Sequence, residues 1–155
     1  MATVFSGTLF ADYHQFYLAD AGSETDYSGD ITDEAIDQRV VSRDDALVVF
    51  TARNMEVPVE VVLHDAAPAL PVDEADHVVT AGLRSSGTIL IAGCTDYAPD
   101  AARFSVPEGA LRAAVVFTGL DTLSEDGLEG EDRYTVHLWP GEAEGVAVLK
   151  QWDGD

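Results

Sequence analysis

The chain has 155 residues, 46% of them hydrophobic, which is enough for one domain with its own core. It carries 29 Asp and Glu against 8 Lys and Arg, so its formal net charge is −21. This charge repels phosphate groups. It argues against direct binding of nucleic acid or of an anionic membrane, and it favours a basic protein or a cation as the partner.

Ten short segments are predicted to be β-strands. Most are rich in β-branched and aromatic residues and alternate between apolar and polar positions. In chain order they span 4–10, 15–19, 46–53, 57–64, 77–83, 88–92, 103–106, 111–118, 133–139 and 146–149. Turn-forming residues separate them, and the segment Ser85-Ser86-Gly87 is predicted to close a hairpin between the fifth and the sixth. The pattern predicts an all-β fold, a mostly antiparallel β-sandwich in which residues 1–155 form a single domain.

One short α-helix is predicted over residues 30–38, after the second strand. Asp30 or Thr32 can cap its N-terminus, and acidic side chains in the first turn complement the helix dipole. We expect Ile31, Ala35 and Ile36 to face the core.

The negative charge is concentrated around this helix. Residues 20–45 contain nine acidic side chains against Arg39 and Arg43, a local net charge of 2 − 9 = −7. Such a cluster attracts a basic protein and accelerates its association. A purely compositional origin, such as adaptation to salt, is the alternative. The residues predicted to bind a partner, with the tyrosine as an exposed aromatic anchor, are Asp26, Tyr27, Asp30, Asp33, Glu34, Asp37, Asp44 and Asp45.

The cysteine content and the lack of long apolar segments indicate a cytoplasmic protein. Cys94 is the only cysteine, so no intrachain disulfide can form. The N-terminus lacks the pattern of a signal peptide, and no apolar run approaches the ~20 residues that span a bilayer.

No motif predicts catalysis. The four histidines, His14, His64, His77 and His137, are scattered along the chain, and none forms a metal-binding motif with another. Phosphate-binding loops and nucleophile motifs are absent from the sequence. We therefore expect a protein that is not an enzyme and needs neither a metal nor another cofactor.

A calcium-binding β-sandwich, similar to C2 domains, is the alternative function. Asp20, Asp26 and Asp30 lie on one predicted loop, and Ca²⁺ prefers clustered oxygen ligands. The loop does not have the EF-hand pattern.

Several sequence blocks resemble a known family. Tyr13-His14-Gln15-Phe16 follows the first predicted strand, and Thr32-Asp33-Glu34-Ala35-Ile36 follows about sixteen residues later. The third predicted strand ends in Ala52-Arg53-Asn54, and Arg103-Phe104-Ser105-Val106-Pro107-Glu108-Gly109 precedes a later one. In this order the blocks resemble the competence protein J family, inhibitors of a bacterial DNA-entry nuclease.

The resemblance implies a small cytoplasmic protein that binds a nuclease and blocks it without catalysis. It gives no inhibitory positions. The shared residues Tyr13, His14, Gln15, Phe16, Thr32, Arg53 and Asn54 are as consistent with maintenance of the fold as with a binding surface. Combined with the acidic cluster, the resemblance predicts that the acidic face occludes the basic groove of a nuclease.

Overall fold

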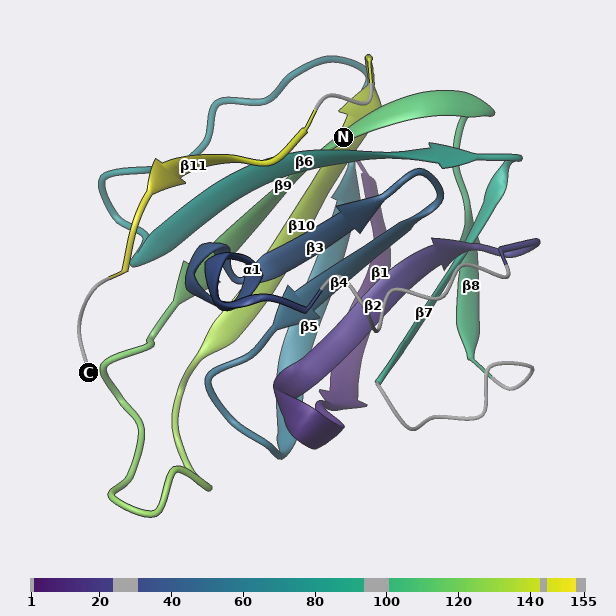
Figure 1. The fold of residues 1–155 in the computed structure, drawn as a ribbon. Coiled ribbons are helices and arrows are strands. Elements are labelled where there is room, and N and C mark those ends of the chain that lie inside the picture. The colour runs from purple at the N-terminus through teal and green to yellow at the C-terminus, as the bar shows by residue number, and fades with distance from the viewer. Residues whose placement is uncertain (1, 24–30, 94–100, 143–144, 153–155) are drawn as a thin grey trace.

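Two β-sheets stacked face to face form the molecule (Figure 1). The structure is a computed structural model, and it describes residues 2–23, 31–93, 101–142 and 145–152. The predicted fold, an antiparallel β-sandwich with one short α-helix, is confirmed.

The first sheet has six strands in the order β1-β5-β10-β9-β6-β11. Its neighbouring strands run antiparallel except β5 and β10, which are parallel. The strands are β1 (Ala2–Phe10), β5 (Glu56–Leu63), β6 (His77–Ser85), β9 (Gly109–Thr118), β10 (Arg133–Pro140) and β11 (Ala147–Lys150).

The second sheet has five antiparallel strands in the order β3-β4-β2-β7-β8. They are β2 (Gln15–Asp20), β3 (Val40–Arg43), β4 (Ala46–Phe50), β7 (Thr88–Gly93) and β8 (Ala102–Ser105). A 3-10 turn, η1 (Asp12–His14), connects β1 to β2. Strand β3, which follows the helix directly, is not among the predicted strands.

The core lies between the sheets and is built from alternate residues of their strands. Phe16, Phe117 and Tyr134 are its large aromatic side chains, and each is at most 1% exposed. The rings of Phe16 and Phe117 contact that of Tyr134 edge-on, with centroids 6.1 and 5.5 Å away. Strand β4 lies between β3 and β2 and is buried along its whole length, as its continuous apolar sequence predicts.

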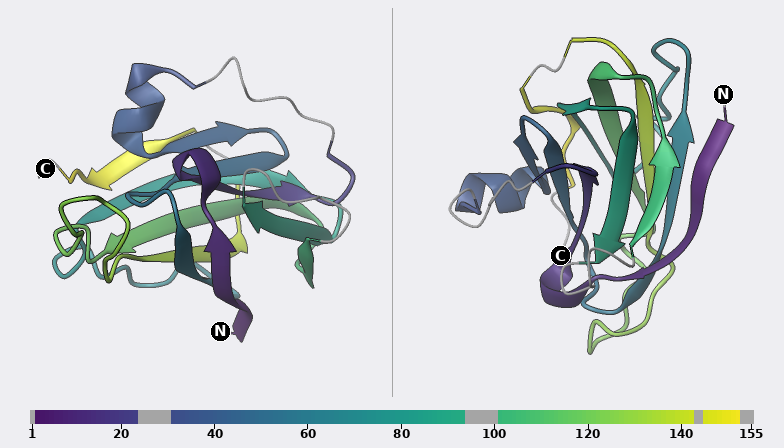
Figure 2. Two further views of the ribbon diagram at one scale, coloured as in Figure 1. Left: turned by 90° about the horizontal axis from the view of Figure 1, so that it is seen from below. Right: turned by 90° about the vertical axis from the view of Figure 1, so that its right-hand side faces the viewer.

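The second sheet is also covered on its outer face, by helix α1 (Asp33–Gln38), which stands outside the two sheets in Figure 2. Ala35 packs there against Val41, Val48 and Phe50. The expectation that Ile36 faces the core is wrong, because its side chain is 51% exposed. A helix this short presents one narrow apolar stripe, and Ala35 occupies it.

The predicted hairpin at Ser86 is also wrong. Strands β6 and β7 belong to different sheets, so the short turn between them crosses from one layer to the other. Asp20, at the end of β2, holds this turn. Its carboxylate accepts hydrogen bonds from the Ser86 backbone N–H at 2.7 Å and from the hydroxyls of Ser86 and Ser85 at 2.9 and 3.2 Å.

Within the described residues, no helix has both the length and the apolar character needed to cross a bilayer.

Candidate partner-binding surface

Helix α1 presents three of the predicted partner-binding acids. Thr32 begins the helix, since its hydroxyl accepts a hydrogen bond from the Ala35 N–H at 3.1 Å. Asp33, Glu34 and Asp37 are exposed. The helix therefore carries carboxylates on its solvent side and Ala35 on its inner side.

The turn between β3 and β4 carries two more of these acids. Asp44 is exposed and Asp45 is half-buried. The Asp44 carboxylate lies 3.5 Å from the Arg84 guanidinium, and both side chains are largely exposed, at 85% and 60%. An ion pair that is exposed to water adds little to the stability of the protein, so the Asp44 carboxylate remains available to bind a cationic group of a partner.

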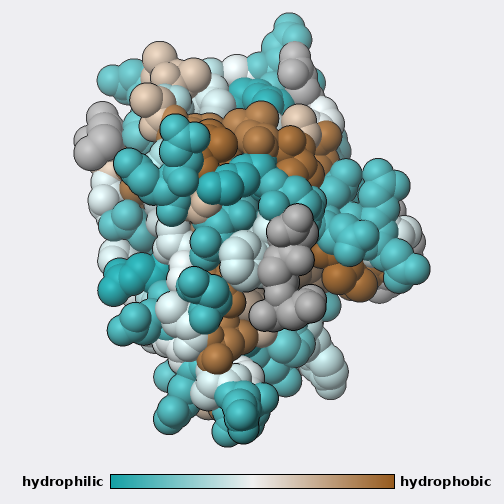
Figure 3. All heavy atoms as spheres, turned by 90° about the vertical axis from the view of Figure 1, so that its left-hand side faces the viewer, coloured by the Kyte–Doolittle hydropathy of each residue, from teal (hydrophilic) through white to brown (hydrophobic). Residues whose placement is uncertain are grey.

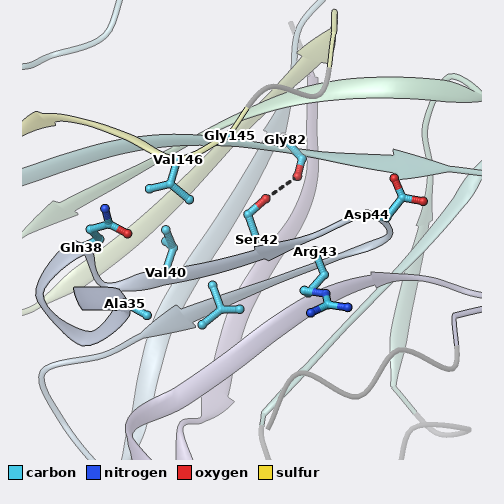
Figure 4. Close-up of a pocket in the computed structure, with 10 residues that line it drawn as sticks. Ala35, Gln38, Val40, Ser42, Arg43, Asp44, Gly82, Gly145 and Val146 are labelled. Carbon is cyan, nitrogen blue, oxygen red and sulfur yellow. Dashed lines mark hydrogen bonds between the residues drawn. The ribbon is translucent and has the colours of Figure 1, made fainter. Parts of the chain in front are cut away.

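A groove runs along β3, between α1 and β6 (Figure 4). Its volume is about 550 Å³. The Ser42 hydroxyl crosses it and donates to the Gly82 carbonyl oxygen at 2.8 Å, whereas the Arg43 side chain points to the opposite side of β3. The lining residues are Ala35, Gln38, Val40, Val41, Ser42, Arg43, Asp44, Gly82, Gly145 and Val146.

The groove lining contains few side chains of the kinds that act in catalysis. Its described residues include one carboxylate, Asp44, and no histidine or cysteine. The Ser42 hydroxyl donates to a backbone carbonyl, not to a base that would activate it. Acidic α1 stands at one end of the groove and Asp44 at the other.

A buried histidine, His77, joins the elements around this groove. Its Nε2–H donates to the Gln38 carbonyl oxygen at 2.9 Å, and its Nδ1 accepts from the Trp152 N–H at 3.0 Å. Burial, with Arg39 nearby, lowers the pKa of His77, so the ring is neutral at pH 7. It ties the end of α1 to the chain that follows β11. Sequence reasoning gave His77 no role because both of its partners are backbone groups.

The side of the molecule seen in Figure 3 is mostly hydrophilic, with hydrophobic patches between the polar residues. Large hydrophobic side chains that are exposed on the chain include Ile36, at 51%, and Leu149, at 49%. Ile36 shares α1 with three exposed carboxylates. Apolar groups set among charges are typical of protein–protein contacts.

Three of the predicted residues, Asp26, Tyr27 and Asp30, lie outside the described residues. Two of them belong also to the predicted calcium loop. The third member of that loop, Asp20, directs its carboxylate to the Ser85–Ser86 turn. Among the residues that the structure places, no three His, Cys, Asp or Glu side chains are grouped so as to hold a metal ion.

Two of the sequence blocks that carry the family resemblance, residues 13–16 and 52–54, lie close together at one end of the sandwich. The Thr51 N–H donates to the His14 carbonyl oxygen at 2.8 Å, and His14 Nδ1 lies 3.2 Å from the Thr51 carbonyl oxygen. Tyr13 and His14 both have left-handed backbones, with φ of 57° and 61°. Gln15 begins β2 opposite Phe50, and Phe16 enters the core.

Arg53 belongs to a buried network at the same end. Its Nε–H donates to Asp132 Oδ1 at 2.5 Å, and the Tyr134 hydroxyl donates to Asp132 Oδ2 at 2.5 Å. That hydroxyl also accepts from the Ala52 N–H at 2.8 Å. Burial and Asp132 raise the pKa of Tyr134.

This network shows what the shared residues do in the fold. Asp132 is fully buried and ion-paired, so it takes no part in the exposed acidic surface. Arg53 and Phe16 act in the interior, whereas Asn54 and Tyr13 are exposed.

Comparison with known proteins gives a match in structure alone. No family model and no curated protein matches the chain. ComJ from Bacillus subtilis, an inhibitor of the DNA-degrading activity of NucA, matches with a TM-score of 0.70 and 19% identity, over 90% of this chain and 98% of its own. The chain has the fold of ComJ.

The product of crocagin biosynthetic gene J also has this fold. It matches with a TM-score of 0.60 and 20% identity, over 92% of this chain and 100% of its own. The predicted resemblance to the competence protein J family is thus confirmed at the level of the fold.

Proposed function

We propose that this protein binds a nuclease and inhibits it, as a non-catalytic cytoplasmic protein without a cofactor. The match to ComJ over nine-tenths of the chain is the observation that carries the proposal. The net charge of −21 is the second support, because a nuclease that holds DNA presents cationic groups to it.

The proposed contact surface consists of Asp33, Glu34, Asp37, Asp44 and Asp45, together with the groove along β3. We call these five acids the acidic face. Their carboxylates take the place of DNA phosphates in the cationic cleft of the nuclease, and the apolar residues around them exclude water from the contact. Asp26, Tyr27 and Asp30 belong to the same proposal on sequence grounds.

A titration of nuclease activity tests the proposal. The purified protein is added to NucA and to DNA-degrading fractions from the organism that makes it, and cleavage of a labelled duplex is followed. The proposal predicts stoichiometric loss of activity in at least one of them, at Mg²⁺ and Mn²⁺ concentrations that saturate the nuclease. Unchanged cleavage in all of them at a large excess of the protein contradicts it.

A further inference from the structure

Two histidines that are far apart in the sequence meet on the outer face of the six-stranded sheet. His64 directly follows β5 and His137 lies in β10, and the parallel register pairs His137 with Val62. Val62 and His64 share one face of the sheet because side chains alternate along a strand. The backbone N–H of His64 donates to the Leu138 carbonyl oxygen at 2.8 Å, and this hydrogen bond holds the two histidines in register.

The two imidazoles face each other through one nitrogen each. His64 Nε2 and His137 Nδ1 are 2.9 Å apart, and the ring planes are inclined by 37°. Both side chains are half-buried. A metal ion binds an imidazole in its neutral form, through the lone pair of one ring nitrogen.

The separation of the two nitrogens fits a particular coordination geometry. Metal–imidazole bonds are about 2.0–2.1 Å long, so two nitrogens 2.9 Å apart subtend about 90° at a shared ion. A tetrahedral ion such as Zn²⁺ requires about 3.3 Å between them. Right angles are typical of the tetragonal or square-planar sites of Cu²⁺ and Ni²⁺.

The type of ligand atom favours the same class of ion. His137 pairs with Ala114 in β9 and with Val62 in β5, and both of these neighbours are buried and apolar. Imidazole nitrogens suit Cu²⁺ and Ni²⁺, whereas Mg²⁺ and Ca²⁺ require oxygen ligands. With two protein ligands, the remaining positions on the ion are filled by water or by a side chain of a partner.

We infer that His64 and His137 form a binding site for a divalent transition-metal ion with right-angle coordination, Cu²⁺ or Ni²⁺. In the free protein, one proton lies between His64 Nε2 and His137 Nδ1. When the ion binds, this proton moves to the other nitrogen of the ring that carries it, the nitrogen that faces away from the ion. Each neutral imidazole then gives one lone pair to the ion, and no net proton is released. The site is separate from the acidic face and does not depend on the proposed function.

Calorimetric titration with NiCl₂ tests this inference, in an excess of Mg²⁺ that occupies the surface carboxylates. Ni²⁺ is the probe because Cu²⁺ oxidises thiols, and the chain contains Cys94. We expect one equivalent of Ni²⁺ to bind the unmodified protein. H64Q and H137Q each lower the affinity at least tenfold, whereas H14Q leaves it unchanged because His14 has no histidine partner in the structure.

A measurement on the unmodified protein gives an answer even where a variant fails to fold. Paramagnetic Ni²⁺ broadens nearby resonances, so we expect the imidazole signals of His64 and His137 to disappear first. If the imidazole signals of His14 or His77 broaden before those of His64 and His137, the inference is wrong. Unchanged affinity in folded H64Q and H137Q, or no binding above that of Mg²⁺, also overturns it.

Discussion

Loss of the Asp132 carboxylate is predicted to be among the most damaging single changes to stability. Asp132 is 0% exposed and accepts hydrogen bonds from Arg53 and Tyr134, both at 2.5 Å. In D132N the Arg53 guanidinium, whose side chain is 11% exposed, loses its counter-charge. Breaking such a buried pair costs about 3–5 kcal/mol. At about 2–4 °C per kcal/mol for a chain of this size, the melting temperature falls by about 6–20 °C.

Urea and thermal unfolding, followed by circular dichroism, measure this effect. D121N is the matched control, because it removes the same charge from an exposed side chain at the start of the same connection and should change stability by less than about 0.5 kcal/mol. The double variant R53M/D132N should recover part of the loss, since the unpaired guanidinium is gone. A loss below about 1 kcal/mol in D132N contradicts the role given to this network.

Three further predictions concern stability. T32A removes the side-chain cap of α1 and should cost about 0.5–2 kcal/mol in urea unfolding. G119A should cost at least about 1–2 kcal/mol because φ is +71° and a Cβ would collide with the Glu131 carbonyl oxygen, whereas G145A, whose Cβ would have no described atom within 4 Å beyond its chain neighbours, should be nearly neutral. Burial lowers the pKa of His77, so as the pH falls the unfolded chain takes up a proton at this histidine before the folded protein does. Stability is therefore full above the unfolded pKa of 6.5 and falls as the pH drops below it, and melting from pH 8 to pH 5 should show a smaller slope in H77Q.

The strand pattern allowed most of the fold to be predicted, because alternation and turn residues are local properties. The apolar sequence of β4 and the cap at Thr32 both appear in the structure as expected. The four-residue β3 was missed because it follows α1 with no turn signal except Arg39, a non-glycine residue in the left-handed conformation.

Contacts between distant residues could not be predicted in the same way. Arg53 and Asp132 are 79 positions apart, and His64 and His137 are 73 apart. Their pairing depends on which strands become neighbours, and the sequence pattern does not specify strand order. For the same reason a hairpin was expected at Ser86, since a short turn within one sheet and a short turn between two sheets use the same residues.

The acidic face was located by its charge density alone, and the structure adds a groove beside it. Asp33, Glu34 and Asp37 are exposed on α1, and Asp44 stands at the far end of β3. The nearby Arg43 and Arg84 reduce the charge at that end. The greater part of the electrostatic attraction is therefore expected at α1.

The most direct test of the proposed function is the association rate of this protein with its nuclease as a function of salt. The variant D33N/E34Q/D37N/D44N changes the net charge from −21 to −17, and so does the control E60Q/E108Q/E125Q/E129Q, whose four acids are exposed elsewhere. Electrostatic steering accelerates association by about 10–10³-fold. We predict about tenfold slower association at low salt for the acidic-face variant, with a flatter salt dependence, and a much smaller change for the control. Equal rates for the two variants would contradict the account.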